Sequence, residues 1–224
     1  TQDWCMPETG CMHEVILCDD GSPCTGGVCL LVVCGEGQVK IAGECIDAAV
    51  AQHLLAAGSN HNCAVRSDGT VWCWGGNLYG QIGGGIPGAC ANEPAPVQVV
   101  GLNDAVGVTA GSGQTCAWKK DGTAWCWGKN WFGQLGNGTQ ENKSEPTQVE
   151  GVASPLALAA GKDHTCALHN DGSLWCWGAN NSGQLGIGSQ EDQSTPIQVV
   201  GLEDAVDVAL GYSHGCALEV DGTV

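Results

Sequence analysis

The sequence predicts an all-β protein built from repeated sheet units and preceded by a small disulfide-rich module. One segment begins four times, and its first cysteine recurs at intervals of 53, 50 and 50 residues, at Cys63, Cys116, Cys166 and Cys216. A fixed period of this size indicates stacked supersecondary units, none of which buries its apolar face alone. Each complete copy also carries Trp-Cys-Trp after an Asp-Gly turn, and seven cysteines lie in the first 45 residues.

The N-terminal part, residues 1–45, is predicted to be a cysteine-rich module. Its seven cysteines are separated by turn residues, and no apolar periodicity persists long enough for a helix. Such a segment cannot build a sufficient core, so disulfides must stabilise it. The repeats fill residues 46–224, and the sequence ends inside the fourth copy. We therefore expect the repeats to continue, with the partner of Cys216 at the second position after Val224.

The first strand of each unit is predicted from apolar alternation, as in Val106–Val108 and Val206–Val208. Ala51–Ala57 is more helix-like in composition, but it aligns with these segments, so a strand is expected there too. The segments between copies, PVQVVG, PTQVEG and PIQVVG, read as further strands, each opened by a proline.

Turn chemistry gives the register of the central hairpin. The loop His169–Ser173 fits a type I turn followed by Gly172 in the left-handed region. This register places Cys166 opposite Cys176 at a non-hydrogen-bonded pair, where Cα atoms lie ~4.5 Å apart, within disulfide reach. The corresponding loops give the same result, so the predicted disulfides are Cys63–Cys73, Cys116–Cys126 and Cys166–Cys176.

The two tryptophans of each Trp-Cys-Trp share one face of the strand, because side chains alternate. Trp72 and Trp74 therefore point away from Cys73. We interpret these tryptophans as packing between units, since burial of aromatic rings contributes the largest burial energy. Stacking of one ring per pair on a ligand is the alternative.

Cys90 lies in a loop that is three residues longer in the first copy than in the later copies. With the seven N-terminal cysteines it makes a set of eight. We predict that Cys90 bonds to the N-terminal module, and the 105 possible connectivities of eight cysteines leave its partner open.

Charge and cysteine usage restrict the compartment and the partners. The chain has 24 acidic and 7 basic residues, a net charge of −17, which argues against direct binding of nucleic acid. No Cys-x-x-Cys pair, metal-ligand cluster or cofactor motif occurs, so no metal and no cofactor is expected. Fifteen cysteines favour an oxidising compartment, either secreted or at the cell surface. No apolar run is long enough to span a membrane.

The pattern G-x-x-H-x-C-A-L-x-x-D-G-x-x-W-x-W-G-x-N-x-x-G-Q-L-G resembles the regulator of chromosome condensation repeat over roughly residues 46–224. The resemblance implies a β-propeller, usually seven blades of four antiparallel strands, of which this chain holds three and a fraction. The founding member of this family is a chromatin-bound nucleotide exchange factor. We do not expect that activity here, because the cysteine pairs depart from the pattern of the nuclear protein and fit a secreted, bacterial-type branch. Other members are binding platforms, including a secreted bacterial inhibitor of β-lactamase.

The repeated histidines are expected to be structural. They are His61, His164 and His214, and copy two has Gln114 in their place. A metal ring would not survive that exchange, whereas a buried side chain bonded to the backbone would. With no nucleophile–base pair visible, no enzymatic activity is expected.

Differences among the copies suggest the binding surface. Copy two has Trp118 where the others have Val or Leu, and it has Trp131-Phe132 where copy one has Leu78-Tyr79. Exposed aromatic residues on loops suit protein hot spots, so Trp118, Trp131, Phe132 and Tyr79 are the candidate partner-binding residues. The predicted function is extracellular, non-enzymatic protein recognition or adhesion. The alternatives are a structural subunit of a surface layer or appendage, which would assemble with other surface proteins, and a secreted enzyme inhibitor.

Overall fold

A computed structural model of the chain describes residues 5–6, 10–11, 38–41, 44–47, 53–85 and 92–224. Thr1–Ala48 and Ala49–Val224 are separate units. In the first unit, β1 (Cys5–Met6) pairs with β2 (Gly10–Cys11), and β3 (Gln38–Ile41) pairs with β4 (Glu44–Asp47), both antiparallel. The disulfides predicted for this unit and for Cys90 lie outside the described side chains.

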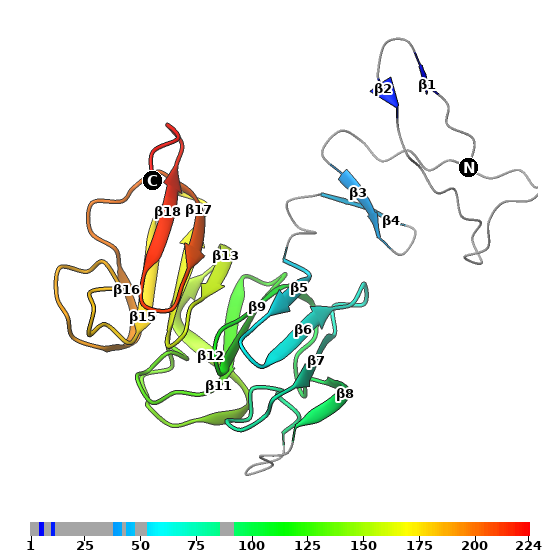
Figure 1. The fold of residues 1–224 in the computed structure, drawn as a ribbon, viewed down its shortest axis with the longest axis horizontal. Coiled ribbons are helices and arrows are strands. Elements are labelled where there is room, and N and C mark those ends of the chain that lie inside the picture. Colours follow the sequence, from blue (N-terminus) through cyan, green and yellow to red (C-terminus); the bar gives the residue numbers. More distant parts are fainter. Residues whose placement is uncertain (1–4, 7–9, 12–37, 42–43, 48–52, 86–91) are drawn as a thin grey trace, which may run out of the picture. The chain divides into compact units, whose positions relative to one another are not determined.

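The second unit contains three four-stranded antiparallel sheets and one two-stranded sheet (Figure 1), with no helix among its described residues. The first sheet consists of β5 (Leu55–Ala57), β6 (His61–Val65), β7 (Val71–Gly75) and β8 (Glu93–Gln98). The second consists of β9 (Ala105–Ala110), β10 (Gln114–Lys119), β11 (Thr123–Gly128) and β12 (Lys143–Ala153). The third consists of β13 (Pro155–Ala160), β14 (His164–His169), β15 (Leu174–Gly178) and β16 (Gln193–Gln198). The last pairs β17 (Ala205–Leu210) with β18 (Gly215–Glu219).

The sheets are blades of a β-propeller, as the sequence predicts. In each complete blade the strands follow one another in chain order, and the first strands of successive blades contact each other. The helix-like composition before Ala57 does not prevent β5 from forming, because β5 pairs with β6. The proline-bearing segments form the outer strands β8, β12 and β16, whose free edges tolerate a missing N–H donor.

The hydrophobic core lies between neighbouring blades. In the first interface, Ile82, Val99 and Leu102 of blade one pack with Ala117 and Trp127 of blade two. The second interface repeats this arrangement with Leu135, Val149 and Trp177. Each blade therefore depends on its neighbour for burial, as a repeat of this period requires.

Candidate functional site

The hairpin between the second and third strands has the register that the turn chemistry predicts. Gly172 has a φ of +79°, and its N–H donates to the carbonyl of His169 at 3.0 Å. Cys166 lies directly opposite Cys176, with 4.1 Å between their Cα atoms. The structure has disulfides at Cys63–Cys73, Cys116–Cys126 and Cys166–Cys176. Cys216, in the incomplete fourth copy, forms no disulfide with another described residue.

The acidic residue before each turn glycine holds the hairpin loop. An Oδ1 oxygen of Asp121 accepts hydrogen bonds from both the N–H and the hydroxyl of Thr123, at 3.0 and 2.6 Å. These bonds lower the pKa of Asp121 to about 2, because they favour the charged form. Asp68, Asp171 and Asp221 make the same contacts with Thr70, Ser173 and Thr223. The turn aspartates are therefore structural.

In the second and third copies the two tryptophans of the motif have different environments, whereas Trp72 and Trp74 of the first copy are both half-buried. The second rings, Trp127 and Trp177, are fully buried between blades. Their indole N–H groups donate across the interface to the backbone carbonyls of Gln81 and Gln134, at 2.8 and 2.9 Å. The first rings are half-buried and donate to a turn hydroxyl, as Trp125 does to Thr123 at 2.9 Å. Packing between units is thus the role of the second ring in copies two and three.

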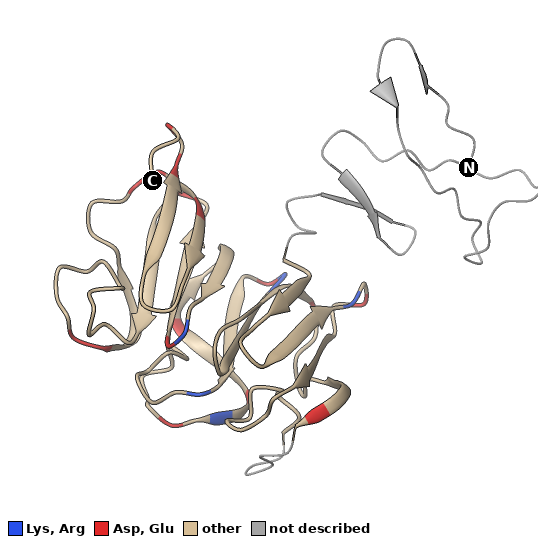
Figure 2. Cartoon of the chain, in the orientation of Figure 1, with Lys and Arg blue, Asp and Glu red and all other residues tan. Residues whose placement is uncertain are grey.

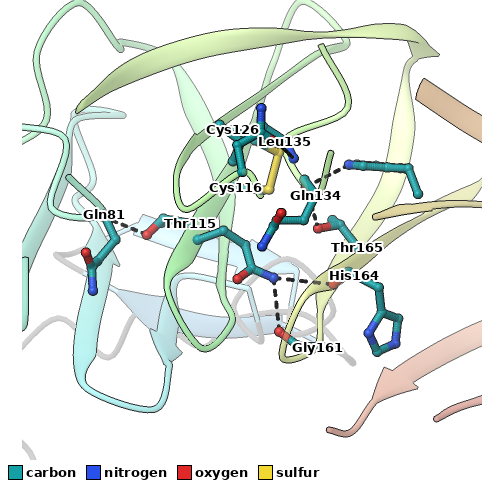
Figure 3. Close-up of a disulfide and its surroundings, with 12 residues drawn as sticks. Gln81, Thr115, Cys116, Cys126, Gln134, Leu135, Gly161, His164 and Thr165 are labelled. Carbon is teal, nitrogen blue, oxygen red and sulfur yellow. Dashed lines mark hydrogen bonds between the residues drawn. A yellow bond between two sulfur atoms is a disulfide. The ribbon is translucent and has the colours of Figure 1, made fainter. Parts of the chain in front are cut away.

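A threonine hydroxyl reinforces the same contact. Thr115 and Thr165 donate to the carbonyls of Gln81 and Gln134, at 2.8 and 2.9 Å (Figure 3). Each of these carbonyls therefore receives two donors from the next blade. This double contact ties the loop that carries the carbonyl to the next blade, because both donors belong to that blade.

The repeated histidine position contacts the next blade, but not in the predicted way. His61 is buried, and its Nε2 lies 2.8 Å from the hydroxyl of Thr115 rather than from a backbone group. In copy two, Nε2 of Gln114 donates to a backbone carbonyl instead, that of Gly161, at 3.0 Å, and a dashed line ends on Gly161 in Figure 3. Both ring nitrogens of buried His164 lack a partner in the described residues, and His214 is exposed.

Three of the four candidate aromatic residues gather around one lysine. Nζ of Lys129 lies 4.8 Å from the ring centroid of Trp131 and 5.7 Å from those of Tyr79 and Phe132. Tyr79 and Trp131 also make an edge contact, with centroids 5.4 Å apart. Trp131 is 54% exposed, whereas Tyr79 and Phe132 are half-buried. We call Tyr79, Lys129, Trp131 and Phe132 the aromatic cluster.

The loops that carry the aromatic cluster are held by amide side chains. Oε1 of Gln81 accepts the N–H of Tyr79 at 2.9 Å, and Oε1 of Gln134 accepts the N–H of Phe132 at 3.0 Å. The amide of buried Asn130 bonds to the carbonyls of Thr139 and Glu141, both at 3.0 Å. These bonds fix the loop backbone, so the exposed ring of Trp131 sits on a rigid support.

Lys129 joins the aromatic cluster to the third blade. Its Nζ lies 2.7 Å from Oδ1 of Asp163, and both residues are buried. Oδ1 of Asp163 also accepts a hydrogen bond from Nε2 of Gln134 at 3.2 Å. The pairing of Lys129 with Asp163 was not predicted from the sequence, although the repeat copies differ at both positions. Gly76 and Ala179 stand in the place of Lys129, and Asn60 and Gly113 in that of Asp163.

Trp118 is not an exposed binding residue, and that prediction is wrong. Trp118 is 4% exposed and packs in the core, with its ring 5.1 Å from that of His53. It lies opposite Gly107 on the neighbouring strand. A Cβ atom on Gly107 would come within 2.1 Å of the Trp118 ring. The tryptophan of copy two is therefore accommodated by a glycine across the sheet.

We expect Gly107→Ala to destabilise the fold by roughly 1–3 kcal/mol, because overpacking forces the buried indole to move. The third copy has Ala157 opposite Leu168 at these positions. The double variant Gly107→Ala/Trp118→Leu reproduces that pair and should recover most of the loss. Chemical denaturation of the parent protein and the two variants measures both effects. An equal loss in the single and double variants would exclude the proposed steric coupling.

Two hollows lie among the described residues of the propeller. A hollow of about 300 Å³ is lined by the first turn of all four copies, including Ser59, Ser112, Lys162 and Tyr212. A second hollow of about 640 Å³ includes His53, Trp118 and Asp207. In the part of the chain that the structure describes, no cluster of three His, Cys, Asp or Glu side chains could hold a metal ion. Among those residues, no helix is long and apolar enough to cross a membrane.

The sheets and loops define a repeat propeller that presents an aromatic surface on its interblade loops. The regulator of chromosome condensation (RCC1) repeat matches residues 68–118, 121–168 and 171–218, and a second form of it matches residues 53–81 and 156–184. The chain belongs to the RCC1 repeat family.

Two relatives illustrate how far the similarity extends. The chain is 35% identical over 88 residues to the human E3 ubiquitin-protein ligase HERC2, covering 38% of this chain and 2% of HERC2. It is 38% identical over 90 residues to the X-linked retinitis pigmentosa GTPase regulator homolog of Caenorhabditis elegans, covering 39% of this chain and 6% of that protein. Because so little of HERC2 is matched, its ligase activity is not transferred to this chain.

Solved structures show the same fold. Human WBSCR16 has a TM-score of 0.65 and 27% identity, covering 74% of this chain and 44% of WBSCR16. Yeast RCC1 (Prp20) in complex with Kap60 has a TM-score of 0.64 and 24% identity, covering 75% of this chain and 41% of RCC1. The chain thus spans less than half the length of these propellers, and the second of them was solved with a protein partner bound.

Proposed function

We propose that this protein is a non-enzymatic, extracellular recognition platform that binds a protein partner through the aromatic cluster. The main support for this proposal is that the ring of Trp131 is 54% exposed, while the loop that carries it is fixed by hydrogen bonds to a buried amide side chain. A large exposed ring on a rigid support suits a hot spot, because little side-chain entropy is lost on binding.

The acidity of the chain narrows the partner class. Lys and Arg residues are few and scattered along the described strands and loops (Figure 2). The cation within the aromatic cluster is already paired, since Lys129 contacts Asp163 at 2.7 Å. A phosphate backbone would meet no basic stripe here, so the partner we propose is a protein rather than a nucleic acid.

The disulfides support the proposed location outside a reducing compartment. The three hairpin disulfides recur at the same position in successive blades. Such bonds persist in secreted, periplasmic and cell-surface proteins. We accordingly propose secretion or surface display, in a bacterial-type branch of the repeat family.

Trp131→Ala should weaken partner binding by at least tenfold, the loss typical of a hot-spot aromatic residue. The full-length protein would be used to capture its partner from culture supernatant, and the affinity of the purified pair measured for each variant. Leu156→Ala is the matched control, because Leu156 is also exposed, at 48%, but lies at the start of β13, away from the cluster. Equal affinity of the Trp131 variant and the parent protein would refute the role of the cluster.

A further inference from the structure

The hollow lined by the first turn of every copy has an unusual composition for this acidic chain. Its volume is about 300 Å³, and equivalent positions of the four turns supply Ser59, Ser112, Lys162 and Tyr212. Each of these turns lies between two described strands. No carboxylate occurs among the described residues that line the hollow, although the chain has 24 acidic residues. We call it the serine–lysine hollow.

The ammonium of Lys162 is only partly neutralised by its neighbours. Its side chain is 33% exposed, and Nζ lies 3.8 Å from Oδ2 of Asp163. The other oxygen of Asp163, Oδ1, already lies 2.7 Å from Nζ of Lys129 and accepts a hydrogen bond from Nε2 of Gln134. One carboxylate is therefore shared by two ammonium groups. The two lysines and Asp163 together keep one positive charge in excess.

The hydroxyl of Tyr212 adds a donor beside this ammonium. Nζ of Lys162 donates to the hydroxyl oxygen of Tyr212 and lies 4.0 Å from the centroid of its ring. The hydrogen bond to Tyr212 and the nearby Asp163 raise the pKa of Lys162, so the amine stays charged. Because the tyrosine oxygen accepts from lysine, its own proton can be donated to a further group. An ammonium and a hydroxyl together suit a carboxylate, which accepts strong charge-assisted hydrogen bonds.

A chain of contacts joins Lys162 to the aromatic cluster. Nζ of Lys129 lies 4.8 Å from the ring centroid of Trp131, and its partner Asp163 contacts Lys162 in turn. The ring of Trp131 and the ammonium of Lys162 are therefore separated by no more than about four residues of extended chain, at ~3.3 Å per residue. A single extended segment is long enough to contact both.

The negative charge of the whole chain does not exclude an acidic ligand at this place. At physiological salt the Debye length is about 8 Å, so exposed charges farther away are largely screened. The groups in contact with the ligand then decide the interaction. Around Lys162 these groups carry the excess positive charge.

We propose that the serine–lysine hollow binds an aspartate or glutamate side chain of the protein partner. An aromatic or apolar side chain of the same segment, within about four residues of the carboxylate, packs on Trp131. Lys162 forms the ion pair, and Tyr212 donates its hydroxyl proton to the same carboxylate. The inference rests on the proposed function, to which it adds the chemistry of the partner.

Two dye-labelled peptides that differ in one charge test the proposal. Each carries a tryptophan and, after three Gly or Ser residues, either glutamate or glutamine, and the reverse order is measured as well. The full chain is titrated into each peptide at about 0.15 M salt, where distant charges are screened, and binding is followed by fluorescence anisotropy. We expect the glutamate peptide to bind about fivefold more tightly, the effect of a partly exposed ion pair. Equal affinities in both orders, or no binding of any peptide, would overturn the proposal.

Lys162→Gln tests the assigned cation. The variant removes the charge but keeps a long polar side chain, so the glutamate peptide should bind no better than the glutamine peptide. Lys119→Gln is the matched control, because Lys119 is 21% exposed and lies 3.0 Å from a carboxylate oxygen of Asp121. Lys119 ends β10 whereas Lys162 precedes β14, so the two lysines lie at opposite ends of their blades. The control should keep the fivefold ratio. Loss of the ratio in both variants, or in neither, would contradict the assignment to Lys162.

Trp131→Ala separates this inference from the proposed function. The variant should weaken binding of both peptides by a similar factor and leave their ratio unchanged, because the ring does not touch the carboxylate. If the two peptides bound the parent equally while Trp131→Ala weakened both, the proposed function would stand and the carboxylate site would fail. If Trp131→Ala changed neither affinity while Lys162→Gln removed the ratio, the carboxylate site would stand and the role of the aromatic cluster would fail. Circular dichroism and the thermal midpoint establish that all variants fold.

Discussion

Trp127→Ala should lower the free energy of unfolding of the propeller by about 3–5 kcal/mol, the cost of emptying a large buried aromatic site. The ring is fully buried between the first two blades, and its N–H donates to the carbonyl of Gln81 at 2.8 Å. Removing it creates a cavity and leaves that carbonyl with only the hydroxyl of Thr115, at 2.8 Å. Chemical denaturation monitored by far-UV circular dichroism measures the loss.

The matched control is Trp125→Ala, two residues away on the same strand. Trp125 is half-buried, and its N–H bonds to a turn hydroxyl of its own blade. Its replacement should cost about 1 kcal/mol, since partly exposed side chains lose less burial energy. Equal costs for the two variants would mean that the interface between blades does not depend on the second ring.

Acidification should destabilise the propeller between about pH 6.5 and pH 4. Burial lowers the pKa of His61 to about 4, because desolvation disfavours the charged ring. The unfolded chain, with an ordinary histidine pKa, binds the proton first, so stability is full above pH 6.5 and falls as the pH drops towards 4. The shift corresponds to about 3 kcal/mol at the acid end of this window. Burial also lowers the pKa of His164, which acts in the same direction.

His61→Gln should flatten this pH dependence while preserving the fold. Copy two already uses Gln114 at the equivalent position, where its Nε2 donates to the carbonyl of Gly161. His214→Gln is the control, because His214 is exposed. Hydrogen bonds lower the pKa of the turn aspartates, so the loss of stability on their protonation falls mainly below pH 4. It is therefore separated in pH from the loss caused by the buried histidines. Unfolding curves at steps of pH measure the slope, and an unchanged slope in His61→Gln would reject buried histidine as its source.

Local chemistry explains why the hairpins could be predicted. The left-handed Gly172 and the oxygen of Asp171 fix a three-residue loop, and the loop fixes which cysteines face each other. Strand alternation then places the two tryptophans on one face. These features depend on residues within about ten positions of each other, so a local sequence pattern is enough to predict them.

Contacts between blades could not be predicted in the same way. Trp118 stands where the other copies have Val or Leu, yet it is buried because Gly107, on another strand, makes room for it. Lys129 of the second blade forms an ion pair with Asp163 of the third, and the partner of His61 is a hydroxyl of the next blade. Each outcome depends on which residue of a neighbouring unit faces the side chain.

The sequence by itself determined the repeat and the register of the disulfide-bonded hairpins, because turn geometry and alternation are local, and its resemblance to a known repeat family implied the propeller class. Only the tertiary structure decided which tryptophans are buried and which aromatic residues remain at the surface. Those features are set by the packing of one blade against the next. Burial is a property of the interface, so two rings separated by one cysteine, such as Trp125 and Trp127, have different roles.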